Sequence, residues 1–128
     1  MARQHQILIV IETPALASDL RAWLSAHGYW VTVVGTYAAG KFHLEMQPSM
    51  AIAEIRLGEY NGLQLAVRAN SSRVPILVVG DRDRFFEHEA EQLGAGYLAF
   101  DDVNPERILS CVERQIAHAA RETTPQTP

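Results

Sequence analysis

The sequence is poor in several residue types and patterns. It has one cysteine, Cys111, and one lysine, Lys41, in 128 residues. A single cysteine excludes an internal disulfide and a thiolate metal cage. No stretch approaches the roughly 18 apolar residues of a membrane-spanning helix. The aliphatic run near the start is shorter than the core of a signal peptide and is followed by Glu12. We therefore expect a cytoplasmic protein with no membrane partner.

A strong excess of charge of either sign is also missing. The chain carries 11 basic and 15 acidic residues, a net charge of −4, and no basic stripe. This argues against direct binding of nucleic acid. Hydrophobic residues make up 48% and charged residues 20% of the chain, as in ordinary globular domains. We expect one domain over residues 1–121, and the Thr/Pro-rich residues 122–128 to form a linker or disordered tail, with or without a downstream output domain.

Short apolar or β-branched runs alternate with segments in which apolar residues recur at helical spacing. The five runs that predict strands are Ile7–Ile11, Trp30–Val34, Met50–Ile55, Val74–Val79 and Tyr97–Ala99. Because parallel strands need a crossover and single helices supply it, the pattern predicts an α/β fold, a (βα)5 doubly wound parallel sheet.

One loop has two interpretations. Asn61-Gly62 is a hairpin signal, but its flanks do not alternate, and Leu63, Ala66 and Val67 follow a helical period. We therefore predict a loop that leads into a helix. The turn after the first strand reads Glu12-Thr13-Pro14. It lacks the glycine-rich fingerprint of dinucleotide enzymes, and no phosphate-binding loop occurs elsewhere.

The informative residues are those at the carboxyl ends of the predicted strands, because open α/β sheets bind ligands there. They are Ile11, Glu12, Glu54, Arg56, Gly80, Asp81, Phe100 and Asp101.

Four stretches together resemble the receiver domains of bacterial two-component response regulators. They are Ile7–Pro14, Pro48–Gly62, Val74–Gly80 and Leu93–Leu98. The resemblance spans most of the chain and is to the chemotaxis-regulator-like type, with a degenerate phosphorylation site. It implies a flavodoxin-like strand order, 2-1-3-4-5.

The resemblance also implies a chemistry. In the family, two acids after the first strand and an aspartate ending the third hold Mg²⁺, and that aspartate accepts a phosphoryl group. A Thr or Ser after the fourth strand and a Lys after the fifth contact the phosphoryl oxygens. The matching positions here are Ile11, Glu12, Glu54, Gly80 and Phe100.

These substitutions predict that phosphorylation at Glu54 is negligible. Removing one pre-organised stabilising group from a catalytic centre costs about 3–4 kcal/mol, and several are changed here. We expect no enzyme activity and no cofactor. Instead we expect a phosphorylation-independent scaffold that binds a signalling protein or an output domain. A weak Mg²⁺ site formed by Glu12, Glu54 and the backbone carbonyl of Arg56 remains an alternative. Pairing of the two glutamates with Arg56, Arg82 or Arg84 is another.

Two further functions stay open. Glu54 could be a permanent mimic of the phosphorylated state, although Gly80 and Phe100 offer no side-chain hydrogen bond to it. The crevice near Gly80, Tyr97 and Phe100 could hold a small molecule. An ordinary enzyme is disfavoured, because no nucleophile–base pair is visible.

A partner surface is predicted around the fourth helix. Phe85 lies one step off the apolar stripe of Phe86, Ala90 and Leu93, so we expect it to be exposed at an interface. By resemblance, Tyr97 occupies an aromatic switch position. Because Gly80 has no hydroxyl to couple with it, we favour a packed or interface tyrosine. The resemblance also implies that the fourth helix, fifth strand and fifth helix form the output or homodimer face.

Overall fold

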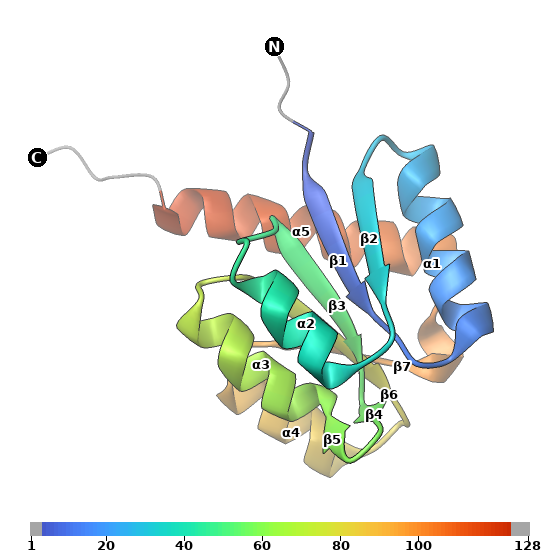
Figure 1. Cartoon of the computed structure of the whole chain (residues 1–128), viewed down its shortest axis with the longest axis vertical. Helices are drawn as coiled ribbons and strands as arrows, with labels where there is room; N and C mark the ends of the chain where they lie inside the picture. The colour runs from blue at the N-terminus through green and yellow to red at the C-terminus, as the bar shows by residue number, and fades with distance from the viewer. Residues whose placement is uncertain (1–3, 124–128) are drawn as a thin grey trace, which may run out of the picture.

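The computed structural model of the chain describes residues 4–123. Its main sheet has five parallel strands in the order β2-β1-β3-β6-β7 (Figure 1). The strands are β1 (Gln6–Val10), β2 (Trp30–Val34), β3 (Met50–Glu54), β6 (Ile76–Gly80) and β7 (Gly96–Ala99). Since β6 and β7 are the fourth and fifth strands of this sheet, the predicted fold class and strand order are confirmed.

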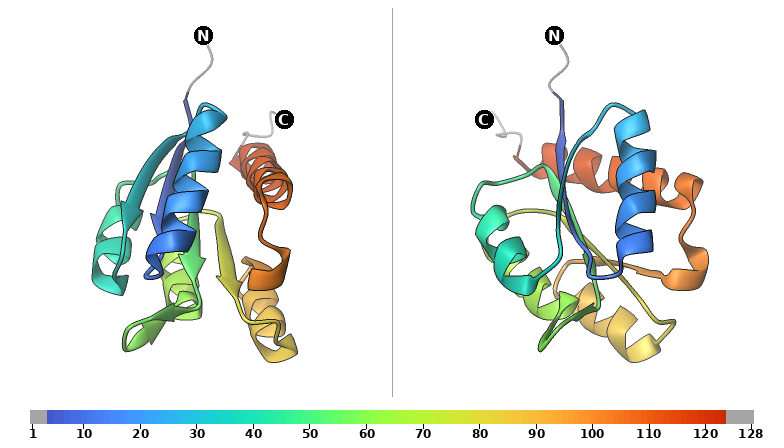
Figure 2. Two further views of the ribbon diagram at one scale, coloured as in Figure 1. Left: turned by 90° about the vertical axis from the view of Figure 1, so that its right-hand side faces the viewer. Right: turned by 45° about the vertical axis from the view of Figure 1, so that its right-hand side comes forward.

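Helices cover both faces of the sheet. They are α1 (Pro14–Ala26), α2 (Tyr37–Leu44), α3 (Gly62–Ser71), α4 (Arg84–Gln92) and α5 (Pro105–Thr123). In Figure 1, α2 and α3 lie in front of the sheet and α5 lies behind it, and Figure 2 shows the sheet between these layers. Side chains of α1 and α5 pack into one core cluster, and those of α2, α3 and α4 pack into the other.

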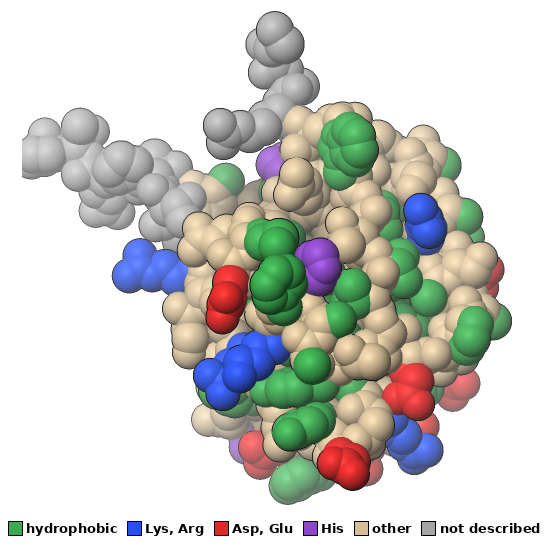
Figure 3. Space-filling view, in the orientation of Figure 1, with side chains coloured by type: hydrophobic (Ala, Val, Ile, Leu, Met, Phe, Trp, Pro, Cys, Tyr) green, Lys and Arg blue, Asp and Glu red, His purple; other side chains and the backbone are tan. Residues whose placement is uncertain are grey.

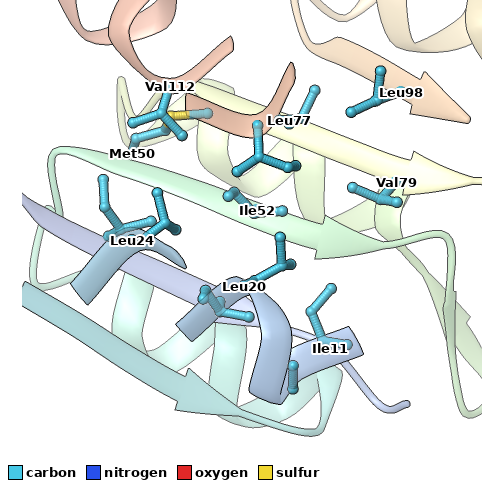
Figure 4. Close-up of a cluster of buried hydrophobic side chains, with 13 residues drawn as sticks. Ile11, Leu20, Leu24, Met50, Ile52, Leu77, Val79, Leu98 and Val112 are labelled. Carbon is cyan, nitrogen blue, oxygen red and sulfur yellow. The ribbon is translucent and has the colours of Figure 1, made fainter. Parts of the chain in front are cut away.

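The central strands are buried on both faces, as continuous apolar runs predict. Every residue of β3 and of β6 is buried. Figure 4 shows how Leu20 and Leu24 of α1 meet Ile52 and Leu77 of the sheet and Val112 of α5. Because buried side chains are closely packed, they hold the carboxyl ends of the strands in a fixed arrangement.

The prediction of a plain loop before α3 is wrong in part. A two-stranded antiparallel hairpin, β4 (Arg56–Leu57) and β5 (Tyr60–Asn61), stands between β3 and α3. Its turn lies at Gly58, which has a positive φ of 63°, and not at Asn61-Gly62. Asn61 instead begins α3, because its side chain accepts a hydrogen bond from the Gln64 amide in a capping box.

The domain boundary at residue 121 stays a prediction. Helix α5 extends to Thr123. The remainder of the predicted tail, residues 124–128, lies outside the described residues. Within residues 4–123, no helix is both long and apolar enough to cross a membrane.

Candidate functional site

An open pocket of about 430 Å³ lies where the strands end. It is lined by Glu12, Thr13, Pro14, Glu54, Arg56, Asp81 and Phe100. Most of these residues lie at or just after the ends of β1, β3, β6 and β7, and Arg56 begins β4. The sheet thus brings together most of the strand-end residues singled out from the sequence. Ile11 does not reach the pocket, because its side chain is buried in the core between the sheet, α1 and α5.

Glu54 is the one buried charged side chain among the described residues, with 6% of its surface exposed. Its Oε1 accepts hydrogen bonds from the backbone N–H groups of Glu12 (2.8 Å) and Thr13 (3.0 Å). Its Oε2 accepts a hydrogen bond of 2.6 Å from the Thr13 hydroxyl. Both carboxylate oxygens are therefore held by the loop between β1 and α1.

The neighbouring strands explain why Glu54 meets this loop. β3 pairs directly with β1, so the last residue of β3 lies beside the segment that follows β1. Glutamate reaches one methylene further than the aspartate expected at this position in the receiver family. The loop leads into the N-terminus of α1, where the helix dipole favours a negative charge.

The side chain of Glu12 has a different hydrogen-bond partner. Its Oε2 accepts a hydrogen bond of 2.9 Å from the Gly58 amide in the hairpin turn. The two glutamates thus bind separate N–H donors. Within residues 4–123, no group of three or more His, Cys, Asp or Glu side chains is placed to hold a metal ion.

The family resemblance implies Mg²⁺, and the donor set does not fit it. Mg²⁺ is held by oxygen acceptors, whereas the Glu54 carboxylate is surrounded by N–H and O–H donors of Glu12 and Thr13. A cation between Glu12 and Glu54 would compete with these donors for the lone pairs of the Glu54 carboxylate, and with the Gly58 amide for Glu12 Oε2.

Arginines do not pair with the two glutamates in the described contacts, so that alternative is wrong for Arg56 and Arg82. Arg56 pairs with Asp81 at 3.2 Å, and Arg82 pairs with Asp102 at 2.9 Å. The Arg56–Asp81 pair lies at the mouth of the pocket. Both side chains are at least half exposed, so the pair adds little stability.

Gly80 leaves space that Tyr97 occupies. The Tyr97 hydroxyl donates a hydrogen bond of 2.5 Å to the Asp81 carbonyl. A Cβ atom on Gly80 would lie 2.5 Å from that hydroxyl oxygen and 2.7 Å from the Cβ of Ile55. Burial raises the pKa of Tyr97 to about 12, and the charges of Asp81, Asp83 and Glu87 add to the effect.

Phe100, at the expected lysine position, begins a short 3-10 helix, η1 (Phe100–Asp102). Its ring is half-buried and packs against both core clusters, so it gives the pocket an apolar wall. Phe85 is 64% exposed on α4, as predicted from its position off the apolar stripe. Its interface role stays a prediction.

Sequence reasoning missed two sets of residues. The first is Thr13, although a hydroxyl beside Glu12 at a strand end is a signal for a polar contact. The second group is a set of exposed apolar side chains away from α4: Trp30, Phe42 and Met46 are each about 60% exposed. The face over α2 and α3 in Figure 3 carries separate hydrophobic side chains on a surface with few charges.

Comparison with known proteins gives one curated relative and many structural neighbours. No family model matches the chain. The TorCAD operon transcriptional regulatory protein TorR of Escherichia coli O157:H7 is 32% identical over 94 residues, which is 71% of this chain. The chain spans only 41% of the length of that relative.

Solved structures share the fold at lower identity. A CheY-like response regulator receiver domain protein from Methanospirillum hungatei JF-1 superposes with a TM-score of 0.85 at 22% identity, covering 94% of this chain and 99% of that one. The receiver domain of a sensor histidine kinase from Pseudomonas aeruginosa PAO1, which has a magnesium ion in its active site cleft, gives 0.78 at 23% identity. That match covers 90% of this chain and 99% of the other.

Proposed function

The chain is a response regulator receiver domain, and from that premise we propose that it signals without being phosphorylated, by binding another protein. The observation that carries the proposal is the binding of both Glu54 carboxylate oxygens by Glu12 and Thr13. An acid that is to accept a phosphoryl group must present a free oxygen in line with the donor. Glu54 is 6% exposed, and both its oxygens accept hydrogen bonds.

The residues that would stabilise the transferring group support the same conclusion. Phosphoryl transfer depends on cations that neutralise the developing charge. The lysine position holds the apolar ring of Phe100, and the hydroxyl position is Gly80, whose side-chain space is taken by Tyr97. The site therefore retains the position of the acid without the groups that make it reactive.

The proposed partner is a signalling protein or a downstream output domain. The proposed docking face consists of α4, β7 and α5, with Phe85 at 64% exposure as its apolar contact. A second copy of the chain can use the same face. Asp83 begins α4 by accepting hydrogen bonds from the amides of Phe85 and Phe86, so the backbone that presents Phe85 is fixed.

The two other functions raised by the sequence have less support. A phospho-mimic at Glu54 needs contacts that transmit its charge to the α4–β7 side, and its hydrogen bonds run instead to the β1–α1 loop. A small-molecule module needs an enclosed cavity that buries most of its ligand, whereas this pocket is open.

Phosphorylation is tested with a small-molecule phosphodonor and millimolar Mg²⁺, followed by intact-mass spectrometry. We expect no adduct on the wild-type chain. Glu54→Asp is the matched variant, because it restores the shorter acid and leaves Gly80 and Phe100 unchanged; it too should remain unlabelled. An adduct on the wild-type chain that is lost in Glu54→Gln would refute the proposal.

A further inference from the structure

We propose that the strand-end pocket is an oxyanion cradle whose permanent occupant is the carboxylate of Glu54. The site then selects a carboxylate and excludes the divalent cation that a receiver domain implies. This inference rests on the proposed function and deepens it, because it names the ligand class of the same site and the group that fills it.

The cradle is built from consecutive atoms of one loop. Three donors converge on the carboxylate within 2.6–3.0 Å: the N–H groups of Glu12 and Thr13 and the hydroxyl of Thr13. An ionised carboxylate has about four lone-pair sites, so Glu54 uses most of its capacity on this loop. Buried charges are stable only when they are hydrogen-bonded in this way.

The missing helix cap at Thr13 also favours an anion in the cradle. Thr13 precedes α1 with an extended backbone, the usual arrangement in which a threonine oxygen accepts a hydrogen bond from the first helical turn. No such bond is made, and the hydroxyl donates to Glu54 instead. The residue that would ordinarily cap the helix is thus used to bind the carboxylate.

The surroundings also favour an anion. Ile11, at the position of the first family acid, is buried in the core and places no negative charge beside Glu54. Glu12 directs its carboxylate to the Gly58 amide. A cation in the cradle would face the N–H and O–H groups of Glu12 and Thr13, whose positive ends repel it.

The ligand class can be tested by removing the occupant. Glu54→Ala deletes the atoms of one acetate ion, a methylene and a carboxylate, and leaves the three donors in place. We expect its Tm to fall by about 5–10 °C. Sodium acetate should raise the Tm of this variant with increasing concentration, relative to sodium chloride at equal ionic strength. Wild-type protein, whose cradle is filled, should not respond to acetate.

NMR identifies the site of binding. In ¹⁵N-HSQC spectra of Glu54→Ala, acetate should shift the amides of Glu12 and Thr13. Millimolar MgCl₂ should leave the Glu12, Thr13 and Gly58 amides unshifted in the wild-type protein. The inference is overturned if acetate acts no better than chloride on the variant, or if Mg²⁺ shifts these amides.

A second pair of variants applies if Glu54→Ala does not fold. Thr13→Val removes the hydroxyl donor and keeps the shape of the side chain, whereas Thr13→Ser keeps the donor. We expect a lower Tm for Thr13→Val than for Thr13→Ser, and equal values would overturn the inference. If acetate does not stabilise Glu54→Ala and the phosphodonor does not label Glu54, this inference fails and the proposed function stands. If acetate stabilises Glu54→Ala but the phosphodonor labels Glu54 in the wild-type chain, the proposed function fails and this inference stands.

Discussion

At the scale of single residues, Glu54 and Gly80 differ in opposite ways from the residues expected at these positions in the receiver family: one side chain is longer and the other is absent. Glu54 extends into the β1–α1 loop and fills the place of an external ligand. Gly80 has no side chain, and the Tyr97 hydroxyl occupies the space that one would fill. This hydroxyl donates a hydrogen bond to the Asp81 carbonyl. The two residues lie at the ends of adjacent strands, β3 and β6, so both changes alter one corner of the site.

Gly80→Ala tests whether Tyr97 depends on the missing side chain. The new Cβ would lie 2.5 Å from the Tyr97 hydroxyl oxygen, a distance that forces one of them to move. We expect a loss of about 1–3 kcal/mol in the free energy of unfolding, measured by urea denaturation. The loss should be smaller in a Tyr97→Phe background, where the hydroxyl is absent. Additive effects of Gly80→Ala and Tyr97→Phe would contradict this coupling.

Tyr97 also predicts a pH dependence at alkaline pH. Its pKa is raised from 10.0 to about 12, first by burial and then by Asp81, Asp83 and Glu87. The folded chain therefore holds the tyrosine proton more tightly than the unfolded chain. The resulting stability is complete below pH 10 and is lost as the pH rises toward about 12.

The measurement is the Tm of wild-type protein and of Tyr97→Phe across this alkaline range. The difference between them should shrink as the pH increases, because only the wild-type chain loses a proton at this position. A difference that stays constant up to pH 12 would show that Tyr97 titrates normally.

At the scale of elements, the segment after β3 combines a hairpin turn with a helix start. Asn61 accepts a hydrogen bond from the Gln64 amide, and the Gln64 side chain accepts one from the Asn61 amide. The same segment supplies the Gly58 amide that holds Glu12. A Cβ on Gly62 would lie 2.7 Å from the Glu54 carbonyl oxygen, so α3 begins against the end of β3 and only glycine fits there.

The capping box should be a measurable part of stability. Asn61→Ala removes the acceptor for the Gln64 amide, and we expect it to cost about 1 kcal/mol in the free energy of unfolding. Asn70→Ala is the matched control, since Asn70 is an exposed asparagine of the same helix and alanine favours helix there. Chemical denaturation of both variants makes the comparison, and equal losses would rule out a specific role for the cap.

At the scale of the whole molecule, the sheet has two open edges, β2 and β7, and exposed apolar side chains lie near both. Phe85 is on α4, which packs beside β7, whereas Trp30 belongs to β2 and Phe42 to α2. Exposure alone does not distinguish the two regions, because Phe85 and Phe42 are 64% and 58% exposed. The family resemblance favours the α4–β7–α5 side for the proposed partner.

A measurement of self-association can distinguish these two regions as contact surfaces. We expect sedimentation velocity to show a dimer that forms with increasing protein concentration and is lost in Phe85→Arg. Phe42→Arg, a matched change of an equally exposed phenylalanine, should leave the dimer unchanged. Loss of the dimer in Phe42→Arg alone would place the contact on the α2 side, and a wild-type monomer at every concentration would exclude homodimerisation.

Local patterns in the chain determined its architecture. The apolar runs at β1, β3 and β6 predict strands buried on both faces, and the intervening helical periods require parallel crossovers. The position of Phe85 one step off the stripe of α4 predicts its exposure, because helical geometry sets which residues share a face. The strand-end residues follow from the same reasoning, since every parallel strand ends at the same edge of the sheet.

Tertiary structure alone decided the contacts at that edge. Glu54 meets Thr13 across 41 positions of sequence, and Tyr97 meets Asp81 across 16. Such contacts depend on which strands pair and on which rotamer a side chain adopts, and neither is encoded in the periodicity of one segment. Sequence alone could therefore identify two glutamates near a pocket, whereas the fold determined that one is bound by the β1–α1 loop and the other by a hairpin turn.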